Sequence, residues 1–215
     1  MLRLDIGLTA ARRDELASLL DPAEQTRRER FHHLVDADRF LIGRATLRRE
    51  LARVLAIDPR DVPLAAGPHG KPFVPGGPHA NVSHAGDVVV IAISDDADVG
   101  IDVEFIDPRF VAEAMIEASF SSGERDTIAA LPDALRVNAF FHTWTSREAV
   151  VKMIGAGFSL PKEAIDVSVD PRLPPRVERA SPPFVCTLQT LVVPARHLAI
   201  VAVAAPGDAF MVTTS

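Results

Sequence analysis

The hydrophobic pattern of the chain changes several times between its two ends. Residues 9–57 carry apolar side chains at helical spacing, and the clearest stripe consists of Phe40, Leu41, Leu47, Leu51, Val54 and Leu55. Asp21 is expected to cap one helix, with Pro22 in its first turn, and Asp36 is expected to cap the next. Residues 58–87 are rich in Gly and Pro, which excludes a long helix there.

Two short apolar runs, residues 88–94 and 99–106, predict strands that pair as a β-hairpin. After residues 107–110 the spacing is helical again to about residue 158, and two closing strands are expected near 184–193 and 197–205. Helices followed by a hairpin therefore occur in both halves. No residue-level repeat accompanies this order of elements, so a duplication rests on the order alone.

The second strand of the predicted hairpin, VGIDVE, carries two carboxylates within an apolar run. Because side chains alternate across a strand, Asp102 and Glu104 share one face, and the apolar residues share the other. Antiparallel pairing would bring Ser83 and His84, which precede the first strand, toward the same corner. The sequence therefore predicts that an acidic pair and a histidine lie close together.

A third set of polar residues lies on the helix predicted over FFHTWTSREAVVKMI. Trp144, Glu148 and Lys152 recur every four residues and so share one helix face. A Glu four residues before a Lys is by itself a common and weak surface pair. Trp144 is expected to be structural and to fill the space beneath Glu148.

Taken together, the acidic residues predict a metal site. Asp102, Glu104 and Glu148 offer three oxygen ligands, which suit a hard cation such as Mg²⁺ and also Mn²⁺. Lys152 and His84 would then meet phosphate oxygens held by that cation. The chemistry that this predicts is phosphoryl transfer, and a metal-dependent phosphohydrolase that uses water as nucleophile fits the same residues. A non-catalytic binding module is a further alternative, against which the presence of all three acids argues.

Composition restricts the partners. The 215 residues have a formal net charge of −6, which argues against bulk nucleic-acid binding. Residues 1–60 nevertheless hold 12 Lys and Arg against 10 Asp and Glu, so this part could face an anion. The single cysteine, Cys186, fits a reducing compartment, the charged N-terminal residues do not resemble a secretory signal, and the apolar runs are too short to span a bilayer. We expect a cytoplasmic protein that binds no membrane.

Three stretches, ANVSHAGDVVVIAI, VGIDVE and WTSREAVVKMIGAGFSLP, together resemble the 4′-phosphopantetheinyl transferases of the larger, surfactin-synthetase-activating type. The tripeptide GKP at 70–72 and the stretch RRERFHHLVDADRFLIGRATLR are similar to that family too. The likeness spans about residues 20–165, with the motifs in the family's order and spacing.

The resemblance implies a specific fold and reaction. Two similar α+β subdomains, residues 1–107 and 108–215, would pack about a pseudo-twofold axis, with the active site in the cleft between them. The enzyme would move the phosphopantetheine arm of coenzyme A to a serine of an acyl or peptidyl carrier protein of fatty-acid, polyketide or non-ribosomal peptide synthesis, and release adenosine 3′,5′-bisphosphate. A monomer is expected, because the chain contains both halves.

The resemblance also implies roles for individual residues. Glu148 would be the base for the incoming serine, and Asp102, Glu104 and Glu148 would hold Mg²⁺. The residues implied in binding coenzyme A are Ser83 from the Ser-His motif, His84 and Lys152 at the pyrophosphate, Lys71 and Pro72 at the adenine end, and Arg27 and Arg39 at the 3′-phosphate.

Two residues depart from the family pattern. Arg147 stands where the family usually has Lys, and Glu24 occupies a stretch where relatives often present a Lys to the 3′-phosphate. The contact with the 3′-phosphate, and with it the selectivity for coenzyme A over its dephospho form, is therefore left open by the sequence.

Overall fold

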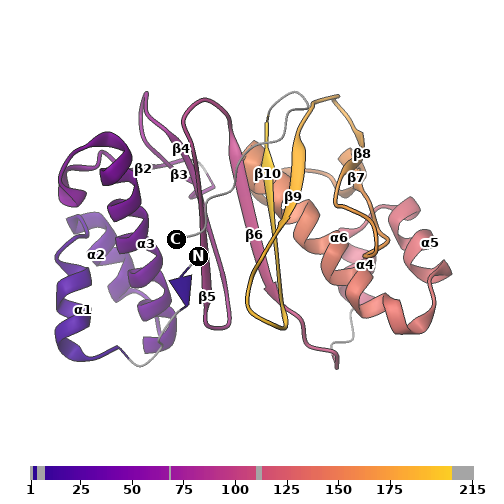
Figure 1. The fold of residues 1–215 in the computed structure, drawn as a ribbon, viewed down its shortest axis with the longest axis horizontal. Coiled ribbons are helices and arrows are strands. Elements are labelled where there is room, and N and C mark those ends of the chain that lie inside the picture. The colour runs from indigo at the N-terminus through magenta and orange to yellow at the C-terminus, as the bar shows by residue number, and fades with distance from the viewer. Residues whose placement is uncertain (1, 4–7, 68, 110–112, 205–215) are drawn as a thin grey trace.

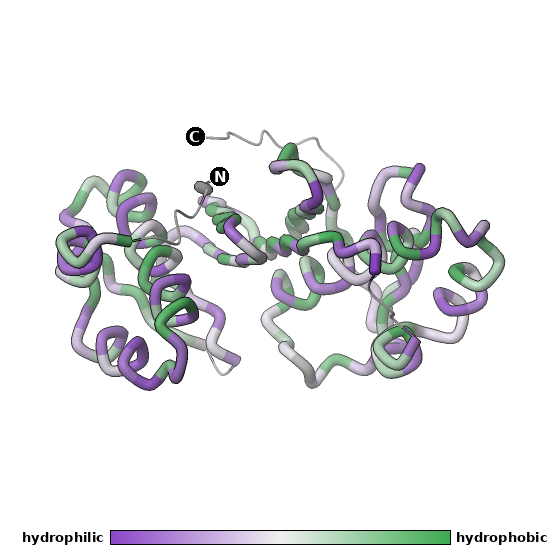
Figure 2. Tube along the Cα trace, turned by 90° about the horizontal axis from the view of Figure 1, so that it is seen from below, coloured by the Kyte–Doolittle hydropathy of each residue, from purple (hydrophilic) through white to green (hydrophobic). Residues whose placement is uncertain are grey.

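The computed structural model describes residues 2–3, 8–67, 69–109 and 113–204. Two groups of helices flank a central set of strands (Figure 1). The N-terminal group consists of α1 (Ala10–Ala17), α2 (Pro22–Glu29) and α3 (Leu34–Leu55). The C-terminal group consists of α4 (Glu113–Ser119), α5 (Ser122–Ala130) and α6 (Asp133–Ile154). Three short 3₁₀ turns lie at Pro59–Asp61, Gly157–Ser159 and Lys162–Ala164. Viewed from below, the helical groups lie on opposite sides of hydrophobic central strands (Figure 2).

The described strands form three antiparallel sheets. The largest has the order β1 (Leu2–Arg3), β5 (Val88–Ser94), β4 (His79–Ala85), β3 (Pro72–Phe73) and β2 (Ala65–Ala66). The second has the order β6 (Val99–Phe105), β10 (His197–Val203) and β9 (Thr187–Leu191). A third pairs β7 (Ile165–Val167) with β8 (Val177–Ala180). The prediction of an α+β fold is confirmed, and the two closing strands of the sequence analysis correspond to β9 and β10.

The predicted hairpin between residues 88–94 and 99–106 is wrong. Strand β5 pairs with β4, and β6 pairs with β10 across the whole strand. Strand β6 instead lies beside β4 and is joined to it through side chains: the Ile101 N–H donates to Asn81 Oδ1 at 2.9 Å, and the Val103 N–H donates to Ser83 Oγ at 3.4 Å. Polar side chains of β4 thus replace a backbone ladder, which the spacing of apolar runs could not reveal.

The two predicted N-caps have different outcomes. Asp21 caps α2 as expected: its carboxylate accepts the Glu24 N–H at 2.8 Å, and Pro22 is the first helical residue. Helix α3 begins earlier than predicted, after His33, whose side chain makes no capping hydrogen bond. Asp36 therefore lies inside the first turn of α3, where its carboxylate accepts Arg39 at 3.0 Å.

The two main sheets meet through one cluster of buried side chains from β5, β6 and β10, which consists of Val88, Val90, Val99, Ile101, Val103, Ala199, Val201 and Val203. The opposite face of β6 lies against α6. There Gly100 leaves no room for a side chain, because an added Cβ would lie 2.1 Å from the Ala149 carbonyl oxygen and 2.2 Å from the Met153 nitrogen. Residue 100 must therefore be Gly for α6 to approach β6 this closely.

A buried arginine ties α3 to the elements around it. Arg48, the fifteenth of the 22 residues of α3, donates to Glu24 at 2.7 Å and to the carbonyl oxygens of Pro59 and Val62 at 3.2 and 3.1 Å. Glu24 also closes the capping box of α2 with Asp21. This hub satisfies a buried charge and joins two helices to the following turn.

A second hub of the same kind lies in the C-terminal group. Arg147 is also the fifteenth of 22 residues, in α6, and donates to Glu124 at 2.7 Å and to the carbonyl oxygens of Lys162 and Ile165 at 2.7 Å each. Glu124 closes the capping box of α5 with Ser121. The two hubs share their parts and their order along the chain, a repeat that the sequence analysis did not detect.

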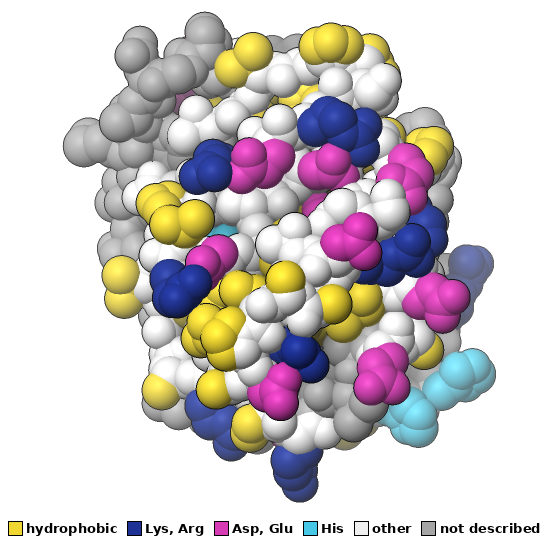
Figure 3. Space-filling model, turned by 90° about the vertical axis from the view of Figure 1, so that its right-hand side faces the viewer, with side chains coloured by type: hydrophobic (Ala, Val, Ile, Leu, Met, Phe, Trp, Pro, Cys, Tyr) yellow, Lys and Arg dark blue, Asp and Glu magenta, His cyan; other side chains and the backbone are white. Residues whose placement is uncertain are grey.

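The outer face of the C-terminal half carries opposite charges side by side (Figure 3). Ion pairs in the same half of the chain join Arg172 to Asp170 at 2.6 Å and Arg179 to Asp166 at 2.6 Å. Because opposite charges lie next to each other, the described part of this face has no extended area of purely positive or purely negative electrostatic potential. Within the described residues, no helix is both long and apolar enough to cross a membrane.

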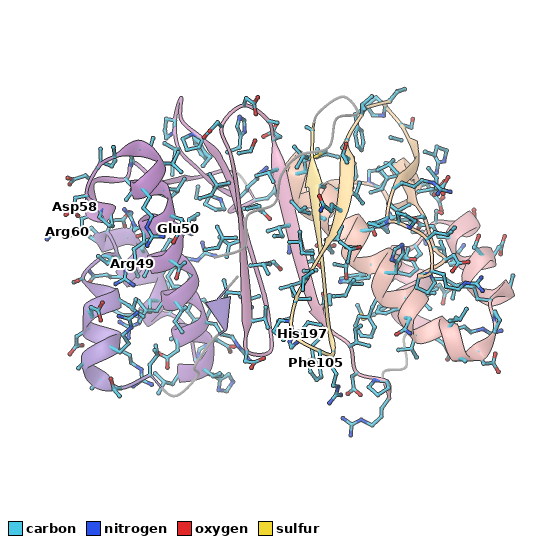
Figure 4. All side chains as sticks on the ribbon, viewed as in Figure 1. Arg49, Glu50, Asp58, Arg60, Phe105 and His197 are labelled. Atoms are coloured by element: carbon cyan, nitrogen blue, oxygen red, sulfur yellow. The ribbon has the colours of Figure 1, made fainter. Side chains whose placement is uncertain are left out.

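An aromatic contact fixes the end of β6 next to β10. Phe105 and His197 are register partners, and their rings meet edge to face with centroids 5.2 Å apart (Figure 4). Arg196, just before β10, places its guanidinium 4.6 Å from the centroid of Phe105. These contacts fix the end of β6 at Phe105, the residue that follows Glu104.

Candidate active site

Side chains from β4, β6 and α6 line a polar hollow of about 250 Å³. Its charged and polar lining consists of Ser83, His84, Asp102, Glu104, Trp144, Glu148 and Lys152. The three sets of polar residues found in the sequence therefore converge as expected. They do so because β6 lies beside β4, and not through the predicted hairpin.

Asp102 is the most enclosed acid of this hollow, at 3% exposure. Its Oδ1 accepts the Lys152 ammonium at 2.5 Å and the Ser83 hydroxyl at 2.9 Å. Lys152 also donates to Ser83 Oγ at 3.0 Å. Burial raises the pKa of Asp102, and the lysine and serine only partly oppose this effect. Its second oxygen, Oδ2, is buried and has no hydrogen-bond partner among the described residues.

Glu104 and Glu148 share the hollow with Asp102. Burial, and then repulsion from Asp102, raises the pKa of Glu104 to about 7. The same two causes raise the pKa of Glu148. The Trp144 indole N–H donates to Glu104 Oε1 at 2.8 Å, so Trp144 holds a carboxylate of the site in addition to packing on Phe140. The sequence analysis predicted only a packing role for Trp144. Its spacing of four residues from Glu148, which places both on one helix face, was the signal that Trp144 also lies at the site.

The residues of the hollow fit a hard divalent cation by their chemistry. Among the described residues, no three His, Cys, Asp or Glu side chains are grouped tightly enough to form a metal site as placed. Yet three carboxylates face one hollow, repulsion from Asp102 helps to raise the pKa values of Glu104 and Glu148, and Asp102 Oδ2 lacks a partner among the described residues. A cation would relieve the repulsion and use the unpartnered oxygen.

Two further hollows continue from the first. One, of about 370 Å³, is lined by Arg27, Arg39, Pro72 and His84 among other residues. The other, of about 270 Å³, is lined by Lys71, Pro72, Glu148 and Lys152 among others. Neighbouring hollows share Pro72, His84, Glu148 or Lys152 as lining residues, so the three form one cleft. All ten residues singled out in the sequence analysis as site residues line this cleft.

Some of these side chains already have protein partners. The Lys71 ammonium donates to the Met153 carbonyl oxygen at 2.8 Å, and burial lowers the pKa of Lys71. Lys71, which lies between β2 and β3, therefore joins the N-terminal half to the end of α6. Arg147 and Glu24, the two departures from the family pattern, lie in the buried hubs described above. Arg147 is thus turned away from the carboxylates of the cleft.

The cleft joins an acidic hollow to cationic hollows, an arrangement suited to a ligand with several phosphate groups and thus to an enzyme of phosphoryl transfer. Residues 98–203 match the model of the 4′-phosphopantetheinyl transferase superfamily, and residues 9–96 match that of the 4′-phosphopantetheinyl transferase N-terminal region. The chain belongs to the 4′-phosphopantetheinyl transferase superfamily.

Individual relatives cover most of the chain. A 4′-phosphopantetheinyl transferase of Bacillus subtilis is 31% identical over 166 residues, which is 76% of this chain and 73% of the relative. The transferase HetI of a Nostoc species is 29% identical over 183 residues, 83% of this chain and 77% of the relative. The transferase AcpT of Salmonella typhimurium is 34% identical over 155 residues, 71% of this chain and 72% of the relative. These matches confirm the resemblance on which the sequence analysis relied.

Proposed function

We propose that this protein transfers the 4′-phosphopantetheine group of coenzyme A to a serine hydroxyl of an apo carrier protein and releases adenosine 3′,5′-bisphosphate. The observation that carries the proposal is the single cleft that joins the carboxylates of β6 and α6 to the arginine-lined hollow of α2 and α3. Coenzyme A has a pyrophosphate and a separate 3′-phosphate. Its charge distribution therefore suits a site with two cationic regions, of which one also holds acids for a metal.

Asp102, Glu104 and Glu148 are the proposed ligands of Mg²⁺, and Mn²⁺ accepts the same oxygen donors. The bound cation would neutralise charge on the pyrophosphate. Lys152 and His84 donate to pyrophosphate oxygens in this proposal. Ser83 contributes by holding both Lys152 and Asp102 through its hydroxyl.

Glu148 is the proposed general base. Its raised pKa increases its affinity for a proton, and it lies at the junction of two of the three hollows. The carboxylate accepts the proton of the carrier serine as the serine oxygen bonds to the β-phosphorus. The bond from that phosphorus to the bridging oxygen breaks, and its electron pair leaves with adenosine 3′,5′-bisphosphate.

The remainder of the cleft is assigned to the nucleotide. Arg27 and Arg39 bind the 3′-phosphate, and Lys71 and Pro72 line the adenine end. The Lys71 ammonium also donates to the Met153 carbonyl oxygen, and this hydrogen bond holds the loop that lines the hollow against α6.

We propose two similar α+β subdomains, residues 1–107 and 108–215, about a pseudo-twofold axis; residues 205–215 lie outside the described part. The matching hubs of Arg48 and Arg147 support this duplication. The two family-model matches meet near residue 97, one strand before the proposed boundary. Because one chain would hold both halves of the cleft, we propose a monomer. The proposed acceptors are carriers of fatty-acid, polyketide or non-ribosomal peptide synthesis in the cytoplasm.

The test is intact-mass spectrometry of apo carrier proteins incubated with this protein, coenzyme A and Mg²⁺. The expected result is the gain of one phosphopantetheine group, abolished by EDTA and by Asp102→Asn. Asp133→Asn is the matched control, because Asp133 is a 90% exposed acid away from the cleft. Hydrolysis of coenzyme A without any carrier would indicate a phosphohydrolase instead, and no turnover on any carrier would indicate a binding module.

A further inference from the structure

Arg44 is a third arginine of the hollow that Arg27 and Arg39 line, and its sequence position did not single it out. Phe40 is the platform for two of these side chains. The guanidinium of Arg27 lies 5.2 Å from the Phe40 ring centroid, and that of Arg44 lies 5.6 Å from it. Because Arg44 follows Phe40 by four residues on α3, the helix places both on the face that borders the hollow.

The acid nearest to Arg44 is already engaged. Glu24 Oε1 lies 3.5 Å from Arg44 Nε, and Glu24 Oε2 accepts Arg48 at 2.7 Å and the Asp21 N–H at 3.0 Å. One carboxylate therefore serves two guanidinium groups and a helix cap. Burial lowers the pKa of Arg44; Glu24 opposes this effect, and the positive charges of Arg27 and Arg48 add to it. Arg44 thus occupies a partly enclosed position in which positive charge is incompletely balanced.

Other features of the hollow also indicate an anion. Arg39 is paired with Asp36 at 3.0 Å through one terminal nitrogen, whereas its Nε is a buried donor with no hydrogen-bond partner among the described residues. Among the described residues that line this hollow, Asp36 is the only acid. Three guanidinium groups and an unused donor suit a phosphate group, which accepts several charge-assisted hydrogen bonds at once.

We propose that Arg44 binds the 3′-phosphate of coenzyme A together with Arg27 and Arg39, and that it determines the preference for coenzyme A over 3′-dephospho-coenzyme A. This inference rests on the proposed function. Glu24 is a positioning residue in this account: its Oε1 lies 3.5 Å from Arg44 Nε at the rim of the hollow, while its Oε2 accepts Arg48 at 2.7 Å. Glu24 occupies a stretch where relatives often present a Lys to the 3′-phosphate. In this chain, Arg44 of α3 provides the positive charge instead.

The experiment compares the binding of coenzyme A and 3′-dephospho-coenzyme A by isothermal titration calorimetry. Arg44→Met removes the charge and keeps most of the chain length. The expected result is a Kd for coenzyme A raised about tenfold, as for the loss of one charge-assisted hydrogen bond, with the Kd for the dephospho form unchanged. Arg44→Lys is expected to recover part of the loss. Arg53→Met is the matched control on α3, because Arg53 is 72% exposed and outside the hollow.

Equal weakening of both ligands, or no change for either, would overturn the assignment of Arg44. Circular dichroism and thermal unfolding establish that the variants are folded, and Arg44→Gln serves as a second variant if Arg44→Met is not. Binding needs no carrier protein, so the inference and the proposed function can fail separately. Absence of transfer with an Arg44-dependent preference would reject the transferase alone, and transfer without that preference would reject the role of Arg44 alone.

Discussion

Replacement of Gly100 by Ala should separate α6 from β6. An added Cβ would lie 2.1 Å from the Ala149 carbonyl oxygen, 2.2 Å from the Met153 nitrogen and 2.8 Å from the Met153 Cα. These are backbone atoms, so no side-chain rotation can relieve the overlap. Ala149 and Met153 are the neighbours of Glu148 and Lys152, and the helix must therefore carry both site residues away from Asp102.

The cost follows from the displacement that the overlap requires. Restoring ordinary contact at 3.4 Å needs a shift of 3.4 − 2.1 = 1.3 Å from the Ala149 oxygen. A gap of only about 0.5–1 Å already forfeits a quarter to a half of the dispersion energy of the atoms on either side. The side chains of Ala149, Val150 and Met153 are 0–3% exposed and pack in the cluster that would open. Overpacking of a core typically lowers the free energy of unfolding by about 1–3 kcal/mol. Because the overlapping atoms here belong to the backbone and cannot rotate away, we expect a loss of about 3 kcal/mol. In a chain of this length that corresponds to a fall in Tm of roughly 6–12 °C.

The assay is chemical denaturation and thermal unfolding of Gly100→Ala, followed by kcat for carrier modification at a temperature where the variant is folded. Gly123→Ala is the matched control, because an added Cβ there meets nothing within 4 Å on the exposed start of α5. That control should be neutral or gain up to about 1 kcal/mol from helix propensity. A Gly100→Ala protein with wild-type stability and wild-type kcat would refute the account of how α6 is held against β6.

Three further predictions concern buried ionisable groups. Arg147→Met should cost about 3–5 kcal/mol of unfolding free energy in urea titrations, because Glu124, at 2% exposure, loses its cation. Without divalent cations, Glu104→Gln should raise Tm at pH 8 and change it little at pH 4.5. The pKa of Glu104 is about 4.5 in the unfolded chain and is raised to about 7 in the folded protein, so the cost of its charge develops between these pH values and is complete above about pH 7. Cys186 should react with iodoacetamide at pH 8 far more slowly in the native than in the urea-unfolded chain, because burial raises its pKa to about 11.

Each of these predictions has its own contrary result. The double variant Arg147→Met, Glu124→Gln should recover part of the lost stability, and a double variant that is less stable than Arg147→Met would contradict the role of the unpaired acid. A stabilisation by Glu104→Gln that is equal at pH 4.5 and pH 8 would show that its charge is not the cause. Equal alkylation rates in the folded and unfolded chain would place Cys186 in an exposed setting.

Much of the fold follows from local sequence. Helical periodicity and the Asp21-Pro22 signal located α2 and the long helices, and alternation placed Asp102 and Glu104 on one face of β6. The start of α3 was missed, because Asp36 is a plausible cap and His33 offers no capping side chain. The partner of β6 was wrong, because two adjacent apolar runs look alike whether they pair with each other or with strands far along the chain.

The sequence by itself determined to which family the chain belongs and which residues we propose for the chemistry, because spaced motifs such as VGIDVE and WTSREAVVK can be recognised without coordinates. The tertiary structure alone decided how they meet. Asn81 and Ser83 hold β6 beside β4 through side-chain hydrogen bonds, and Gly100 admits α6. The matched hubs of Arg48 and Arg147, and the place of Arg44 beside Arg27, also emerged only in three dimensions. Such contacts join residues far apart in the chain, and their energies depend on burial, which no local pattern records.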